Sequence, residues 1–262
     1  MWNHTIFAWL LQPSTSTQLL DGKLAILHIG KTGGSEISRR LRFAHTDRVM
    51  FLTHDFAQVA FKDGRCHLGR NRQFIFFVRD PVRRFVSGWI ERYRMGRPDY
   101  FEAHSTLEAS SFERFKTPDQ LGCALSSSNQ SVAREARNAM RAHRHVAGLS
   151  HYLGNLSNVM SCFGRIFFVG RTEHLDQDYL QLLALFEGQN VLSVDEPLRS
   201  PPGRLHATPP ELISLSWLGT CALNNLRLWF RDDYRTIRYL VRRGALPAPY
   251  LAEMNAFARA VT

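Results

Sequence analysis

Short apolar runs alternate with longer helical patterns along most of the chain. Four runs have the length and continuous apolar character of buried strands, at residues 24–29, 48–52, 73–78 and 165–169. Helical periodicity covers residues 35–43, 81–94, 131–147, 173–187, 211–217, 220–231 and 233–242. Strands that alternate with helices predict an α/β fold, with a central parallel sheet of about four to five strands flanked by helices in three layers.

Two segments interrupt this alternation. Residues 95–130 are rich in Gly, Pro, Ser and mixed charge, and we interpret them as an irregular insertion over the ligand site, where acceptor specificity could reside. Residues 188–210 form a second loop that contains several prolines. We therefore predict an N-terminal extension at 1–22, one catalytic domain at 23–245 and a C-terminal tail at 246–262.

The strongest candidate for chemistry is the segment His28–Ser35, with the sequence HIGKTGGS, which joins the first apolar run to a helix. Such a turn directs backbone N–H groups and a helix N-terminus at one point, which attracts phosphate or sulfate. Lys31 adds a positive charge, and Thr32 and Ser35 add hydroxyl donors. The triphosphate pattern G-x-x-x-x-G-K-[ST] is incomplete, because its first glycine would fall at Ala25. The turn therefore suits one terminal anionic group better than a triphosphate with magnesium.

A second anion site is predicted after the third apolar run. Asp80 and Pro81 follow it as a helix N-cap and a first helical residue. Arg79 then stands at the C-terminal end of the strand, and Ser87 lies about two turns into the helix. Because ligands bind outside the C-terminal ends of parallel strands, both motifs should meet at one sheet edge. A second phosphate could touch Arg79 and Ser87 there.

These motifs, taken in order, resemble those of sulfotransferases, and most closely the carbohydrate sulfotransferases of the heparan sulfate 2-O and 6-O type. HIGKTGGS resembles their 5′-phosphosulfate loop, and residues 78–87 resemble their 3′-phosphate motif. Residues 167–175 and 228–234 are similar to later elements of the same enzymes. The resemblance covers residues 24–240 and implies a P-loop-type fold that transfers a sulfuryl group to an acceptor hydroxyl.

The resemblance also implies the donor, 3′-phosphoadenosine 5′-phosphosulfate (PAPS), and no requirement for a metal. Its 5′ end would be bound by six residues of the first motif: Gly30, Lys31, Thr32, Gly33, Gly34 and Ser35. Lys31 would hold the oxygen that bridges sulfur and the 5′-phosphate. The 3′-phosphate would be bound by Arg79 and Ser87, with Arg204 in the loop at 203–208 as a third contact.

The acceptor hydroxyl needs a general base. His54 follows the second apolar run, so it is expected at the C-terminal end of that strand, beside the first motif. The enzymes that this chain resembles carry a histidine base in the loop after the second strand. Asp55 is the competing base, or it caps the following helix. His28 lies within the first strand and is expected to orient the loop from below.

The charge of the chain bears on the acceptor. The formal net charge is +10, and nearly all of the positive charge is arginine, which binds phosphate and sulfate in a bidentate manner. The resemblance implies a carbohydrate acceptor, and the charge indicates that this acceptor could itself be anionic. A solvated surface is the alternative explanation for the candidate acceptor-binding arginines, which are Arg92, Arg94, Arg97, Arg134, Arg137, Arg141 and Arg144.

Two other classes stay open. A P-loop kinase or nucleotidase would need a complete phosphate loop and a magnesium-holding aspartate, for which Asp80 is the only candidate. A nucleic-acid-binding protein would explain the charge, but no recognised signature is present, and no nucleic-acid partner is expected. The four cysteines include no C-x-x-C pair, so no metal site is expected. The apolar run at 6–11 is too short to span a bilayer, so we expect a soluble cytoplasmic enzyme of bacterial type or a trimmed catalytic domain of a Golgi enzyme.

Overall fold

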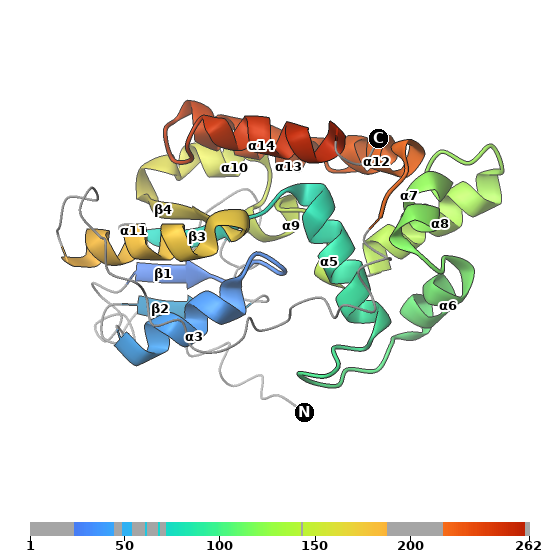
Figure 1. Cartoon of the computed structure of the whole chain (residues 1–262), viewed down its shortest axis with the longest axis horizontal. Coiled ribbons are helices and arrows are strands. Elements are labelled where there is room, and N and C mark those ends of the chain that lie inside the picture. The colour runs from blue at the N-terminus through green and yellow to red at the C-terminus, as the bar shows by residue number, and fades with distance from the viewer. Residues whose placement is uncertain are drawn as a thin grey trace.

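A four-stranded parallel sheet forms the centre of the molecule (Figure 1). The computed structural model describes residues 24–44, 49–53, 61, 68, 72–142, 144–187 and 217–259. The strands stand in the order β2-β1-β3-β4. Their bounds are β1 (Leu24–Leu27), β2 (Val49–Leu52), β3 (Phe74–Val78) and β4 (Ile166–Arg171). The predicted α/β fold with a central parallel sheet is confirmed, and each strand lies within two residues of its predicted range.

The register of the sheet brings the ends of β1, β2 and β3 together. Leu27, the last residue of β1, pairs with Leu52 of β2 on one side and with Phe76 of β3 on the other. All five residues of β3 are buried, because helices cover both faces of the sheet. The segments that follow these strands therefore leave from one edge.

Helices surround the sheet on both faces. Short 3₁₀ turns accompany them in the described part of the chain: η2 (Arg144–Val146), η3 (Phe163–Arg165) and η4 (Thr172–His174). The α-helices of the described residues are α3 (Gly34–Ala44), α5 (Pro81–Tyr93), α6 (Thr106–Arg114), α7 (Pro118–Ala124), α8 (Gln130–Ala142), α9 (Ser150–Leu153), α10 (Leu156–Ser161), α11 (Leu175–Glu187), α12 (Thr220–Trp229), α13 (Arg231–Arg242) and α14 (Pro249–Arg259). None of the described helices is long and apolar enough to cross a membrane.

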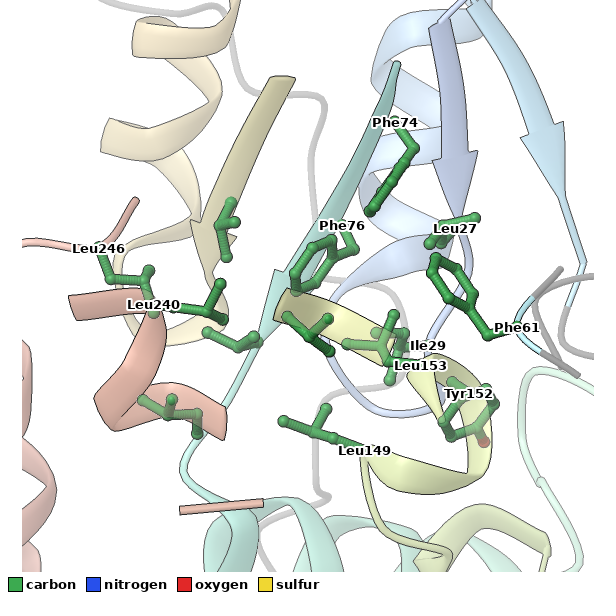
Figure 2. Packing of buried hydrophobic residues seen from close by; sticks show 14 of the residues in the cluster. Leu27, Ile29, Phe61, Phe74, Phe76, Leu149, Tyr152, Leu153, Leu240 and Leu246 are labelled. Carbon is green, nitrogen blue, oxygen red and sulfur yellow. The ribbon is translucent and has the colours of Figure 1, made fainter. Parts of the chain in front are cut away.

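The alternation of side chains along β3 builds two cores. Ile75 and Phe77 face one cluster, which α3 and α11 complete. Phe74 and Phe76 face the other, where they meet side chains from α9, α13 and the chain that leads into α14 (Figure 2). Leu153 of α9 packs in this second cluster. The predicted arrangement of a sheet between two helical layers is therefore confirmed.

A third apolar cluster lies beside the sheet, among helices alone. It joins α5 to α6, α7, α8 and α12 through Trp89, Phe112, Leu121, Met140 and Leu223. The prediction that residues 95–130 are irregular was therefore wrong. The segment contains α6 and α7, and its capping residues explain the error, because a polar stretch can hold short capped helices that lack a clear period. Ser105 forms a capping box with Glu108 at the start of α6.

The C-terminal segment also differs from its prediction. Residues 246–262 were expected to be a tail, but α14 packs into the core beside the sheet. Leu246 and Tyr250 are almost fully buried, and Met254 is buried as well. The predicted helix at 131–147 ends as α8 at Ala142, and η2 follows it. The N-terminal extension at 1–22 and residues 211–216 of the predicted helix at 211–217 lie outside the described residues.

Candidate active site

A tight turn between β1 and α3 forms the predicted anion-binding loop. The backbone of Lys31 has a φ of 64° and that of Gly33 a φ of 80°, so both adopt the left-handed conformation. The turn ends at Gly34, where α3 begins and its first N–H groups have no intrahelical partner. A chain that turns in this way presents successive N–H groups to one concave site, which is the geometry that binds an anion.

Two side chains hold the loop from within. The Thr32 hydroxyl, which is buried, donates a hydrogen bond of 2.9 Å to the carbonyl oxygen of Ile29. Because its hydroxyl is already engaged, the predicted contact of Thr32 with an anion would be made by its backbone N–H. The imidazole of His28 lies directly against Gly34, where an added Cβ would come within 2.2 Å of His28 Cδ2. His28 therefore supports the loop from below, as expected.

The second predicted motif meets this loop. Arg79 follows β3, and its Nη1 donates to the carbonyl oxygen of Lys31 over 3.4 Å. Burial lowers the pKa of Arg79, and Arg83 lowers it further, while Glu173 opposes the shift. Ser87 lies half-buried two turns into α5. The structure thus brings Arg79 to the loop that carries Lys31, although 48 residues separate them.

Asp80 joins the start of α5 to the C-terminal helices. Its carboxylate caps the helix by accepting from the N–H of Arg83 at 2.9 Å, and it accepts from the Tyr234 hydroxyl at 3.0 Å. Its own N–H donates to Glu173, whose second oxygen accepts from the Tyr250 hydroxyl. Burial raises the pKa of Asp80. Asp80, the magnesium ligand that the kinase alternative needs, is therefore engaged in contacts that hold the start of α5 in place.

Arg84 is a structural element of the site that the sequence analysis did not identify. Its side chain is fully buried, and it donates to the carbonyl oxygens of Gly30 and Ala147, the first over 3.4 Å. Its Nη2 also lies 3.8 Å from a carboxylate oxygen of Asp233. No sequence signal marked Arg84 as buried, because the apolar residues of α5 gather on one face of the helix and Arg84 falls opposite them. A charge buried at such a position must be paired.

The sequence analysis also missed the contact between Glu91 and His145. The same oxygen of Glu91, Oε2, lies 3.0 Å from Lys31 Nζ and 2.6 Å from Nδ1 of His145. Gly88 makes this approach possible, because an added Cβ there would come within 2.3 Å of the carbonyl oxygen of His145. Helix α5 and η2 therefore pack backbone to backbone beside Lys31 of the loop at 28–35.

The remaining predicted residues divide into two groups. Gly30, Gly33, Gly34 and Ser35 belong to the loop and to the first turn of α3. His54, its competitor Asp55 and Arg204 lie outside the described residues, so their placement stays a prediction. The structure therefore describes the loop at 28–35, which is proposed below to bind the donor and is then called the donor loop, and the Arg79–Ser87 motif.

The predicted acceptor-binding arginines do not behave alike. Arg92 is buried and forms ion pairs with Glu108 at 2.7 Å and with Glu102 at 2.9 Å, so it ties α5 to α6. It is therefore a structural residue, and its expected role toward the acceptor was wrong. Arg134 and Arg141 lie exposed on α8, and Arg141 stacks over the Trp229 ring.

Comparison with known proteins places these features in one family. A sequence model described as the sulfotransferase family matches residues 21–201, which is more than half of the 262 residues. The matched range contains the loop at 28–35, the motif at 79–87 and the Glu91–His145 pair. No curated protein matches the chain significantly.

Proposed function

Because the chain belongs to the sulfotransferase family, we propose that it transfers the sulfuryl group of PAPS to a hydroxyl of a carbohydrate acceptor. The observation that carries this proposal is the hydrogen bond from Arg79 to the carbonyl oxygen of Lys31. It joins two anion-binding motifs at one sheet edge, and PAPS carries two separate phosphate groups that need two such motifs. A triphosphate would not need the second motif.

The residues present fit the donor. The N–H groups between Thr32 and Ser35 lie at the start of α3, where the helix dipole favours an anion. In the proposal they bind the 5′-phosphate, and Arg79 and Ser87 bind the 3′-phosphate together with Arg204. PAPS supplies an activated sulfuryl group whose departure leaves negative charge on the 5′-phosphate.

Lys31 is the proposed catalytic residue on the donor side. Lys31 belongs to the loop whose N–H groups are proposed to bind the 5′-phosphate, and its ammonium pairs with Glu91 at 3.0 Å. A fixed positive charge stabilises the negative charge that develops as the bond between sulfur and the bridging oxygen breaks. Because that charge grows only during the reaction, the interaction lowers the barrier rather than merely strengthening binding.

His54 is the proposed base on the acceptor side. Leu52, two residues earlier, pairs with Leu27, and its carbonyl oxygen accepts from the N–H of His28 at 3.0 Å. The chain therefore leaves β2 directly beside the donor loop, which supports a place for His54 near the transferred group. In this role His54 takes the proton of the acceptor hydroxyl as the oxygen attacks sulfur.

The acceptor is proposed to be a glycan, and a glycan that already carries acidic groups would best match the net charge of +10. Exposed arginines on α8 support this, because Arg134 and Arg141 could bind sulfate or carboxylate groups. The stacking of Arg141 over Trp229 also places an aromatic ring on this surface. These residues are proposed to act in acceptor binding only.

The test is sulfate transfer from labelled PAPS to a panel of glycans, phenols and alcohols, with EDTA present throughout. We expect transfer to a glycan without added metal. Lys31→Met should lower turnover by about 10²-fold to 10³-fold, as loss of one transition-state donor does. His54→Ala should abolish transfer while it retains binding of adenosine 3′,5′-bisphosphate, the desulfated donor. A wild-type protein that neither binds this nucleotide nor transfers sulfate would overturn the proposal.

A further inference from the structure

Glu91 is the meeting point of three parts of the chain. It lies in the third turn of α5, and its Oε2 contacts the Lys31 ammonium of the donor loop and the His145 imidazole of η2. Tyr100, in the segment after α5, also hydrogen-bonds to this carboxylate. The Glu91 side chain is only 5% exposed. A buried acid with three partners from separate segments holds a defined position.

The charges in this cluster depend on one another. Burial alone would raise the pKa of Glu91, but the hydrogen bond with His145 and the charge of Lys31 lower it to about 2. Burial lowers the pKa of Lys31, and Glu91 opposes that effect. Arg79 and Arg94 act in the same direction as burial, because each places a like charge near the amine. The charge on Lys31 is therefore maintained chiefly by Glu91.

We infer that Glu91, anchored by His145, is a positioning residue that holds the Lys31 ammonium at the donor loop and releases it to the anionic 5′ end of the donor. This inference rests on the proposed function, since it assigns Lys31 to the donor. In the structure Lys31 is paired with Glu91 at 3.0 Å. When the donor binds, the ammonium exchanges one anion for another.

The exchange is feasible because Glu91 keeps other partners. Breaking a buried ion pair is costly when it leaves one charge uncompensated. Here His145 lies 2.6 Å from the same oxygen, and Tyr100 contacts the carboxylate as well. Glu91 therefore remains hydrogen-bonded after Lys31 has turned to the donor. The pair with His145 also limits the repulsion between Glu91 and an incoming phosphate.

The direct test reads the protonation of Lys31 without any nucleotide. The chain has only four lysines, so acetylation by acetic anhydride can be followed at each one by mass spectrometry. Reactivity rises as the amine loses its proton. In Glu91→Gln the reactivity profile of Lys31 should move to lower pH by about one to three units, as loss of a neighbouring opposite charge implies. Lys116, which is exposed on the chain before α7, should keep its profile.

Three variants separate positioning from a merely structural role. Glu91→Asp retains the carboxylate and should restore most of the wild-type profile. His145→Asn retains the Glu91 carboxylate and should not move the Lys31 profile to lower pH, so a shift in Glu91→Gln is assigned to the loss of that carboxylate. Glu113→Gln makes the same change of charge at an exposed site on α6 and should leave Lys31 unchanged.

The second measurement is the affinity for adenosine 3′,5′-bisphosphate across the same pH range. In Glu91→Gln, the loss of affinity at alkaline pH should begin at a pH lower by the same one to three units, about the shift expected for Lys31. A wild-type Lys31 profile in Glu91→Gln, with nucleotide binding intact, overturns the positioning role. Absence of nucleotide binding in the wild type instead overturns the proposed function, whatever the acetylation profile shows.

Discussion

Replacing Arg84 by methionine should destabilise the protein severely, although Arg84 is not proposed to touch any ligand. Methionine fills similar space but leaves the carbonyl oxygens of Gly30 and Ala147 without this donor. It also leaves Asp233, which is almost fully buried, without its positive neighbour. At 3.8 Å the gross attraction between the two charges is about 4 kcal/mol for an effective dielectric constant near 20.

The net effect follows from the asymmetry of buried ion pairs. Removing one partner costs about 3 to 5 kcal/mol, because the other charge stays buried without compensation. We therefore expect Arg84→Met to lower the free energy of unfolding by that amount. Asp233 still accepts the N–H of Leu149 at 2.8 Å, which limits the loss. Asp233→Asn combined with Arg84→Met should cost less than the sum of the single changes, by about 1 to 3 kcal/mol.

The assay is urea unfolding followed by far-ultraviolet circular dichroism for the wild type, both single variants and the double variant. Arg235→Met is the matched control, because Arg235 forms a shorter ion pair of 2.8 Å with Asp232 but is exposed. An exposed pair contributes about 0 to 1 kcal/mol, so this control should be nearly neutral. A loss below about 1 kcal/mol in Arg84→Met, or strict additivity in the double variant, would refute the reasoning.

Two further predictions concern the loop and its buried acid. Gly34→Ala should lower the free energy of unfolding by about 1 to 3 kcal/mol, because the added Cβ would displace the His28 ring. The same displacement should weaken binding of adenosine 3′,5′-bisphosphate. Gly164→Ala is the control: it has open space around it and should be neutral in the same unfolding and binding assays. Because the folded pKa of Glu91 is depressed from 4.5 to about 2, its stabilisation is present above pH 4.5 and is lost as the pH falls toward 2. The difference in unfolding free energy between wild type and Glu91→Gln should therefore shrink by about 3 kcal/mol between about pH 5 and pH 2, and a constant difference would contradict the assignment.

The sequence predicted those parts of the fold that local patterns determine. Strands β1 and β3 are buried on both faces, so each reads as an unbroken apolar run that needs no tertiary information. The start of α5 was equally clear, since Asp is favoured at the N-cap and Pro at the first helical position, where Asp80 and Pro81 stand. In contrast, α6 begins with a capping box inside a polar stretch, where composition was a misleading guide.

The contacts of the site could not be predicted in the same way. Glu91 and His145 lie 54 residues apart, and only the packing of η2 against Gly88 brings them together. Arg92 shows the opposite failure, because a positive charge near a binding motif suggested a ligand, whereas Glu102 and Glu108 pair with it. A side chain's type indicates what it can bind, and its neighbours in space determine which partner it has.

The strand and helix that carry the second motif also hold the first motif in place. Arg79 donates to the carbonyl oxygen of Lys31, Arg84 donates to that of Gly30, and Glu91 binds the Lys31 ammonium. These three side chains come from one continuous segment, so the donor loop cannot keep its geometry if that segment shifts. Arg84→Met should therefore weaken binding of adenosine 3′,5′-bisphosphate as well as stability. The Arg79–Ser87 motif is thus proposed to bind one phosphate directly and to order the site for the other.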